Sequence, residues 1–300
     1  VPAEVFNRRW RMRPGASPAD PFGRTNDQVR MNPPRASEDL LEPAGPTDPE
    51  ASFLSLQSAA GAPIALLANY SLHYVGGTGG NHISADYFGA FAHRLVRLWG
   101  VEDQDPPAVV AMSNGTSGDI NNIDFRATSQ RQPPYAQIQH VAGQVATAVF
   151  ASLPDLEYRE DVTLDARTAR LMLDRRLPTA AEVARAETIL AGSDTMALTT
   201  TQQIYARETV LLKDLPPTDE VVVQALRIGE LGIGATPCET FVETGLAIKE
   251  HSPLQPTFVV SLANDYAGYL PTAEQHRWGG YETWRARSSY LAPNAEAAIR

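Results

Sequence analysis

Apolar residues along this chain recur with two spacings, one typical of strands and the other of helices. Short apolar or alternating runs predict strands at residues 52–58, 63–71, 108–112, 161–174, 221–226, 231–235 and 257–262. Recurrence every three or four positions predicts helices at residues 84–99, 135–153, 179–191, 200–213 and 240–249. Because strands and helices alternate, we expect an α/β fold with a mixed β-sheet flanked by helices.

Two pairs of neighbouring elements are expected to form hairpins. The strands at 52–58 and 63–71 flank a small-residue turn at 60–62, which predicts a β-hairpin. The helices at 179–191 and 200–213 are polar and amphipathic, so we expect an αα-hairpin on the outer surface.

The beginning of the chain differs from the rest. Residues 1–50 are rich in Pro, Arg, Asp and Asn and show little hydrophobic periodicity. We therefore expect residues 1–50 to be an irregular segment packed on the domain formed by residues 51–300. With 300 residues and 43% hydrophobic content, the chain can bury a stable core.

Charge and cysteine content exclude several classes of function. The net charge of -10 argues against nucleic acid or anionic lipid as a partner, and the basic patch at residues 8–13 is too short to change this. No apolar run approaches the ~20 residues of a transmembrane helix. Cys238 is the only cysteine, which excludes a disulfide framework and a thiolate zinc site and favours a buried residue over a nucleophile. The chain carries no signal segment, and secretion stays open.

Polar residues that can carry chemistry follow several predicted strands. His73, the glycine-containing loop at 114–122 and residues 264–269 each come directly after a strand, and Glu239 follows a fourth. Active sites of α/β enzymes are built at such strand ends. Singly, His73 is better explained as a core histidine, Glu239 as a helix N-terminal carboxylate and Tyr269 as a core aromatic. Together they provide nitrogen and oxygen donors that suit Zn²⁺.

Four stretches, in the same order, resemble the catalytic domain of the neutral ceramidase family. They are residues 69–92, 111–122, 231–250 and 258–284, and the similarity extends over roughly residues 45–285. In that family two histidines, a glutamate and a tyrosine hold a zinc ion. The resemblance assigns the second histidine to His73, the glutamate to Glu239 and the tyrosine to Tyr269. It also assigns Tyr281 to the tyrosine that polarises the amide carbonyl.

The sequence departs from the family at two positions. Asn121 stands where the family has its nucleophilic serine, and a carboxamide nitrogen is a very poor nucleophile. Thr116 and Ser117 lie in the same loop, where hydroxyls bonded to a tight turn are the better explanation. No histidine precedes His73, so we expect an upstream part of the domain to be absent from this chain, or a companion segment to supply the missing ligand. The family's C-terminal immunoglobulin-like domain has no counterpart here.

These features predict a secreted or periplasmic zinc-dependent hydrolase that cleaves the amide bond of a small-molecule or lipid N-acyl substrate with a metal-activated water. Asn121 is expected to orient the water or the substrate, and Tyr281 to stabilise the oxyanion. One alternative is a catalytically inactive ceramidase-like protein that binds a ligand without turnover. A second alternative is a protein that holds no metal ion, in which His73 and Tyr269 are core residues.

Overall fold

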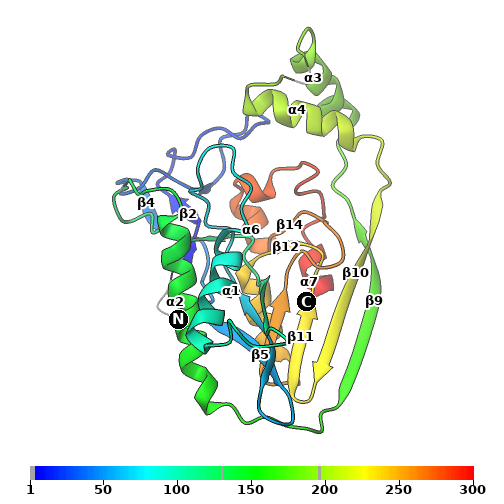
Figure 1. Ribbon diagram of the computed structural model, residues 1–300. Helices are drawn as coiled ribbons and strands as arrows, with labels where there is room; N and C mark the ends of the chain where they lie inside the picture. The colour runs from blue at the N-terminus through cyan, green and yellow to red at the C-terminus, as the bar shows by residue number, and fades with distance from the viewer. Residues whose placement is uncertain (1–3, 130, 195–196) are drawn as a thin grey trace.

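The computed structural model describes residues 4–129, 131–194 and 197–300, which build two main β-sheets with helices packed against them (Figure 1). The main strands are β5 (Ala51–Gln57), β6 (Pro63–Tyr70), β7 (Val109–Asn114), β9 (Leu164–Asp174), β10 (Thr218–Ile228), β11 (Leu231–Ala235) and β13 (Thr257–Val260). The helical elements are α1 (Asp86–Trp99), α2 (Ala136–Ser152), η1 (Leu153–Asp155), α3 (Ala180–Leu190), α4 (Thr201–Leu212), α5 (Val242–His251), α6 (Ala273–Trp278), η2 (Tyr281–Thr283) and α7 (Ala295–Ile299). The predicted α/β class, with mixed sheets and flanking helices, is confirmed.

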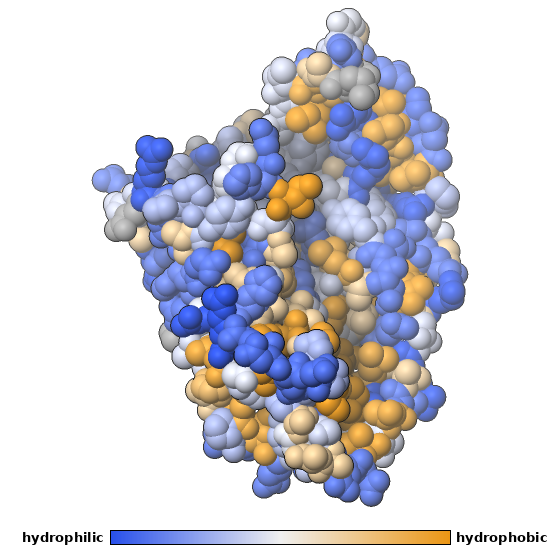
Figure 2. All heavy atoms as spheres, in the orientation of Figure 1, coloured by the Kyte–Doolittle hydropathy of each residue, from blue (hydrophilic) through white to orange (hydrophobic). Residues whose placement is uncertain are grey.

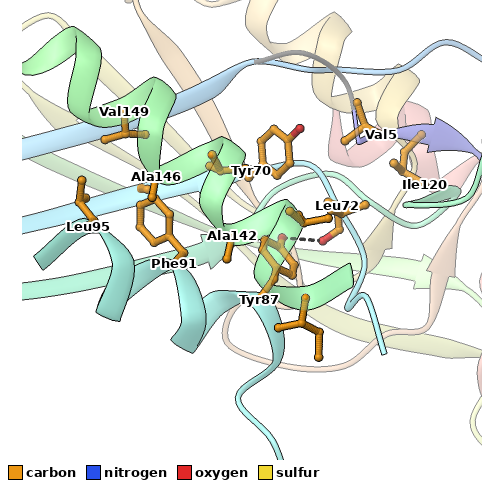
Figure 3. Packing of buried hydrophobic residues seen from close by; sticks show 14 of the residues in the cluster. Val5, Tyr70, Leu72, Tyr87, Phe91, Leu95, Ile120, Ala142, Ala146 and Val149 are labelled. Atoms are coloured by element: carbon orange, nitrogen blue, oxygen red, sulfur yellow. Dashed lines mark hydrogen bonds between the residues drawn. The ribbon is translucent and has the colours of Figure 1, made fainter. Parts of the chain in front are cut away.

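The first sheet has the order β5-β6-β7 and carries α1 and α2 on one face. β5 and β6 form the predicted antiparallel hairpin, whereas β6 and β7 are parallel. Tyr70 of β6 and Phe91 of α1 are fully buried in the core between sheet and helices (Figure 3). The Tyr87 hydroxyl donates to the Leu72 carbonyl at 2.9 Å, so α1 fixes the backbone directly before His73.

The second sheet has the order β13-β11-β10-β9. β9 and β10 are antiparallel along their full length of 11 residues each, and β11 and β13 are parallel. Parallel strands end at the same edge of a sheet. The segments that follow β11 and β13, which carry Glu239 and Tyr269, therefore meet.

The αα-hairpin predicted for the outer surface is confirmed as α3 and α4, which project from the body of the molecule (Figure 1). Each helix begins with a capping box: Thr179 pairs with Glu182, and Thr200 with Gln203. These reciprocal bonds satisfy backbone groups that a helix start otherwise leaves free. No helix in the described ranges is long and apolar enough to cross a membrane.

The described part of the N-terminal segment includes four short strands between stretches without regular structure. It contains β1 (Phe6–Asn7), β2 (Arg9–Met12), β3 (Val29–Met31) and β4 (Leu40–Pro43). β2 lies between β3 and β4 in an antiparallel sheet. Hydrophobic periodicity did not reveal these strands because each has only two to four residues. The division of the chain at residue 50 stays a prediction.

Cys238 lies just before the short strand β12 (Glu239–Thr240) and is fully buried. Burial raises the pKa of its thiol to about 12. A thiol that stays protonated in an apolar environment is unreactive, in line with the structural role expected for this residue.

Candidate active site

His73 lies three residues beyond β6, and its two ring nitrogens face different partners. Nδ1 is 2.9 Å from the carbonyl oxygen of Ser117, which can only accept, so Nδ1 carries the proton. Nε2 therefore presents a lone pair, and it lies 3.6 Å from Oε2 of Glu239. Burial, together with the nearby Arg8 guanidinium, lowers the pKa of His73 to about 4. The imidazole is thus neutral near neutral pH.

Glu239 and Tyr269 are brought together by backbone pairing. β12 pairs in parallel with β14 (Tyr269–Leu270), and Glu239 is directly opposite Tyr269. The Tyr266 hydroxyl donates to Oε1 of Glu239 at 3.1 Å, and Nη2 of Arg8 donates to the Tyr269 hydroxyl at 3.0 Å. Burial raises the pKa of Glu239, and the phenols of Tyr269 and Tyr266 counter it by hydrogen bonding. Burial also raises the pKa of Tyr269, and Arg8 opposes that shift.

The structure thus places His73, Glu239 and Tyr269 in one site, although these residues are far apart in the sequence. When Glu239 is ionised, its Oε2 and Nε2 of His73 are both acceptors, so a cation can be held between them. The described residues contain no metal-holding group of three or more His, Cys, Asp or Glu side chains. A phenol oxygen is the third donor at this site, and the three together are an N/O donor set suited to Zn²⁺.

Tyr281 begins η2 beside these residues. Its ring meets that of Tyr269 edge to face, with centroids 6.0 Å apart and an interplanar angle of 73°. Tyr281 and Tyr266 line a cavity of about 760 Å³, which continues to Tyr205 on α4 and to Tyr290. Figure 2 shows the surface recessed below the α3–α4 hairpin, and α4 forms one wall of this cavity. The cavity therefore connects the candidate site with the hairpin.

Asn121 lies on β8 (Ile120–Asn121), opposite Phe6 of β1. Its Nδ2 donates to Oδ1 of Asn32 at 2.9 Å, and its Oδ1 accepts from the Ile123 backbone N–H at 2.9 Å. The side chain is 8% exposed. Each end of the carboxamide is engaged with protein, and each retains capacity for one further hydrogen bond. The proposed role of Asn121 depends on that remaining capacity.

Thr116 and Ser117, the hydroxyl residues of the same loop, are buried. Oγ of Ser117 donates to the side-chain oxygen of Asn114 at 3.0 Å, rather than to the backbone of the turn. The methyl and hydroxyl groups of Thr116 pack against Gly245 of α5, where a Cβ atom would clash with them. Both side chains hold the loop in place, and Ser117 also contributes its carbonyl oxygen to His73.

Arg8 and Glu282 also belong to the site, but the sequence pattern does not indicate them. Nε of Arg8 donates to Oε1 of Glu282 at 2.9 Å, and Nη1 of Arg9 donates to Oε2 at 2.6 Å. All three side chains are buried. The sequence shows Arg8 and Arg9 only as a basic patch, and they are more than 270 residues from Glu282. No sequence signal links groups at that separation.

Comparison with solved structures identifies the architecture. The neutral ceramidase from Pseudomonas aeruginosa superposes with a TM-score of 0.56 and 22% identity over 84% of this chain. A structure described as a ceramidase complexed with C2 gives a TM-score of 0.58 and 19% identity over the same share. The fold is ceramidase-like. The chain spans less than half of these structures, 45% and 46% respectively. No family model and no curated protein matches the sequence.

Two carboxyl groups, those of Asp119 and Glu243, lie at the start of α5; Asp119 is fully buried and Glu243 partly buried. Asp119 caps α5 by accepting the Val242 backbone N–H at 2.9 Å. Glu243 accepts from Gln275 at 2.9 Å, and its other oxygen is buried with no hydrogen-bond partner among the described residues. Burial, with Asp119 adding to it, raises the pKa of Glu243 to about 7. Burial likewise raises the pKa of Asp119 to about 6.

We predict that Glu243→Gln stabilises the protein increasingly as pH rises. The pKa of Glu243 is raised in the folded state, so its contribution to stability is present below pH 4.5 and lost as pH rises through about 7. The amide retains the shape and the hydrogen bond from Gln275. The free energy of unfolding, measured by urea denaturation at pH 5 and pH 8, should exceed that of the parent by about 1–3 kcal/mol at pH 8 and by much less at pH 5. The exposed control Glu230→Gln should show no such trend, and a pH-independent gain for Glu243→Gln would contradict the explanation.

Proposed function

We propose that this protein is a zinc-dependent hydrolase of the amide bond in N-acyl substrates. The observation that supports it best is the 3.6 Å approach of Nε2 of His73 to Oε2 of Glu239. In a neutral histidine whose Nδ1–H is held by a carbonyl, the free Nε2 is oriented as in metal-ligating histidines. The Ser117 carbonyl is the group that orients this ring.

Three side chains would hold the zinc: His73 through Nε2, Glu239 through its carboxylate and Tyr269 through its phenol oxygen. Tyrosine is an uncommon ligand because its proton must be displaced. Arg8 favours that displacement, since its guanidinium donates to the Tyr269 oxygen and stabilises negative charge there. Zinc, when bound, lowers the pKa of a water molecule towards neutrality and so supplies a nucleophile without a serine.

The remaining groups would act on the substrate. Tyr281 carries a hydroxyl beside the ligands and would donate to the oxygen of the tetrahedral intermediate. Asn121 would use its remaining donor and acceptor to orient the water or the amide. The cavity lined by Tyr266 and Tyr281 would receive one arm of a small-molecule or lipid amide.

Binding without turnover is the second candidate function. Asn121 replaces the family's serine, and its amide is already engaged by Asn32 and Ile123. A protein that retains the cavity but does not hydrolyse amides would have these features. Turnover of an N-acyl amide by the purified protein separates the two functions.

Two further parts of the proposal rest on the ceramidase resemblance. One is a companion segment that supplies a second histidine to the zinc. The other is a location outside the cytoplasm, either secreted or periplasmic.

We expect freshly purified protein that has not met a chelator to carry about one zinc ion per site, and His73→Ala to lose it. Removing one zinc-ligating side chain takes away most of the protein's affinity for zinc. Elemental analysis by mass spectrometry measures this, with the exposed His93→Ala as the matched control. Protein without any first-row metal, or a His73→Ala variant that keeps its zinc, would end the metal hypothesis.

A further inference from the structure

Tyr74, the residue directly after His73, is unusually exposed for its size. At 68% exposure it is the most exposed of the ten tyrosines in the chain. Its ring lies next to that of His73, with centroids 5.4 Å apart. Its hydroxyl makes no hydrogen bond within the described residues. Neither burial nor hydrogen bonding therefore explains a large aromatic side chain at this position.

The backbone around Tyr74 is nevertheless held firmly. The two carboxylate oxygens of Asp86 accept the backbone N–H groups of Val75 and Gly76, each at 2.8 Å. Gly76 and Gly77 have positive φ angles of 72° and 73°, which turn the chain away after Val75. The backbone that carries the exposed ring is thus held at the edge of the site.

Tyr74 and Tyr281 border the same group of side chains. The Tyr74 ring lies next to that of His73, and the Tyr281 ring meets that of Tyr269 edge to face. Tyr281 lines the 760 Å³ cavity, but Tyr74 is not among the residues that line it. An amide has an arm on each side of its reacting carbon, so one arm can enter this cavity while the other extends past it.

We propose that Tyr74 positions the substrate arm that stays outside the cavity, by packing its ring against an apolar or aromatic group on that arm. This proposal rests on the proposed amide hydrolysis and adds a specificity-determining residue to it. The expected substrates are therefore amides with a bulky group on each arm. Exposed aromatic rings give such contacts at low entropic cost because only two side-chain torsions are fixed.

The test uses four amides in which each arm is either small or aromatic: N-methylacetamide, N-benzylacetamide, N-methyl-3-phenylpropanamide and N-benzyl-3-phenylpropanamide. For Tyr74→Ala we expect KM to rise about five- to tenfold for amides with an aromatic group on the outer arm. KM for N-methylacetamide and kcat for all four should stay within twofold. Tyr74→Phe should give the same KM values as the parent, because the Tyr74 hydroxyl makes no hydrogen bond within the described residues. The control variant is Tyr158→Ala, because the ring of Tyr158 is also exposed, at 39%.

Each other outcome has a defined meaning. An equal KM change for all four amides, or no change, would overturn the proposal. A uniform fall in kcat would do so too, because it would indicate an effect through His73. If the parent hydrolyses none of the amides, the proposed function fails on its own, and dissociation constants from calorimetry replace KM with the same expected pattern. A parent that binds none of the four overturns both.

Discussion

Glu239→Gln should lower kcat/KM for any amide substrate by about 10³-fold or more while leaving the fold intact. The carboxylate is the negatively charged member of the proposed ligand set, and an amide oxygen is a far weaker ligand for zinc. The shape of the side chain is unchanged. The new amide N–H can donate to the lone pair on Nε2 of His73, which the carboxylate only faces at 3.6 Å. Loss of the zinc would itself lower stability, so we expect the variant in the presence of a chelator to be as stable as the chelated parent, or more stable.

Kinetics and urea denaturation of the same preparation measure both effects. Glu274→Gln is the control, since Glu274 is an exposed glutamate in a long surface contact with Arg277, at 3.9 Å. A Glu239→Gln variant within tenfold of the parent's activity would exclude Glu239 as a ligand. A variant that loses activity and is also less stable than the parent when both are chelated would favour the alternative in which these residues are only part of the core.

The second large effect is expected from Glu282→Gln, which should destabilise the protein by about 3–5 kcal/mol. Glu282 is fully buried and binds both Arg8 and Arg9. Burial alone would raise the pKa of Glu282, but the guanidinium groups of Arg9 and Arg8 more than offset it, and the pKa lies below its usual value. Removing the charge leaves two buried cations without their shared counter-ion.

Urea denaturation at neutral pH tests this prediction, again with Glu274→Gln as the control. A loss below about 1 kcal/mol would mean that the buried ion pairs contribute no more than surface pairs do. Because Arg8 also donates to the Tyr269 hydroxyl, we expect the zinc content of the Glu282 variant to fall as well.

The sequence predicts this fold where its elements are long and amphipathic. The β5–β6 hairpin, α1, α2 and the α3–α4 hairpin lie within a few residues of their predicted positions. It fails for β1 and β8, which have two residues each, because they form through pairing with distant segments. Local pattern carries no information about such pairing.

The residues of the candidate site likewise include some that the sequence indicates and some that it does not. His73, Glu239 and Tyr269 could be found because each follows a predicted strand in a motif that resembles one of the neutral ceramidases, and the structure brings them together. Their assigned roles stay predictions. Arg8 and Glu282 could not be found, since their ion pair joins the two ends of the chain. The hydrogen-bond partners of Asn121 were equally inaccessible, because Asn32 lies 89 residues away.

The carbonyl oxygen of Ser117 that orients His73 has a consequence for how this fold can diverge. A main-chain carbonyl is present whatever side chain the residue carries. The side chains of the loop at 114–122 can therefore change while the imidazole stays oriented, provided that the backbone path is kept. Gly118 protects that path, because a Cβ there would clash with the Glu239 carbonyl oxygen. The chemical character of this loop and the orientation of the histidine are thus separable.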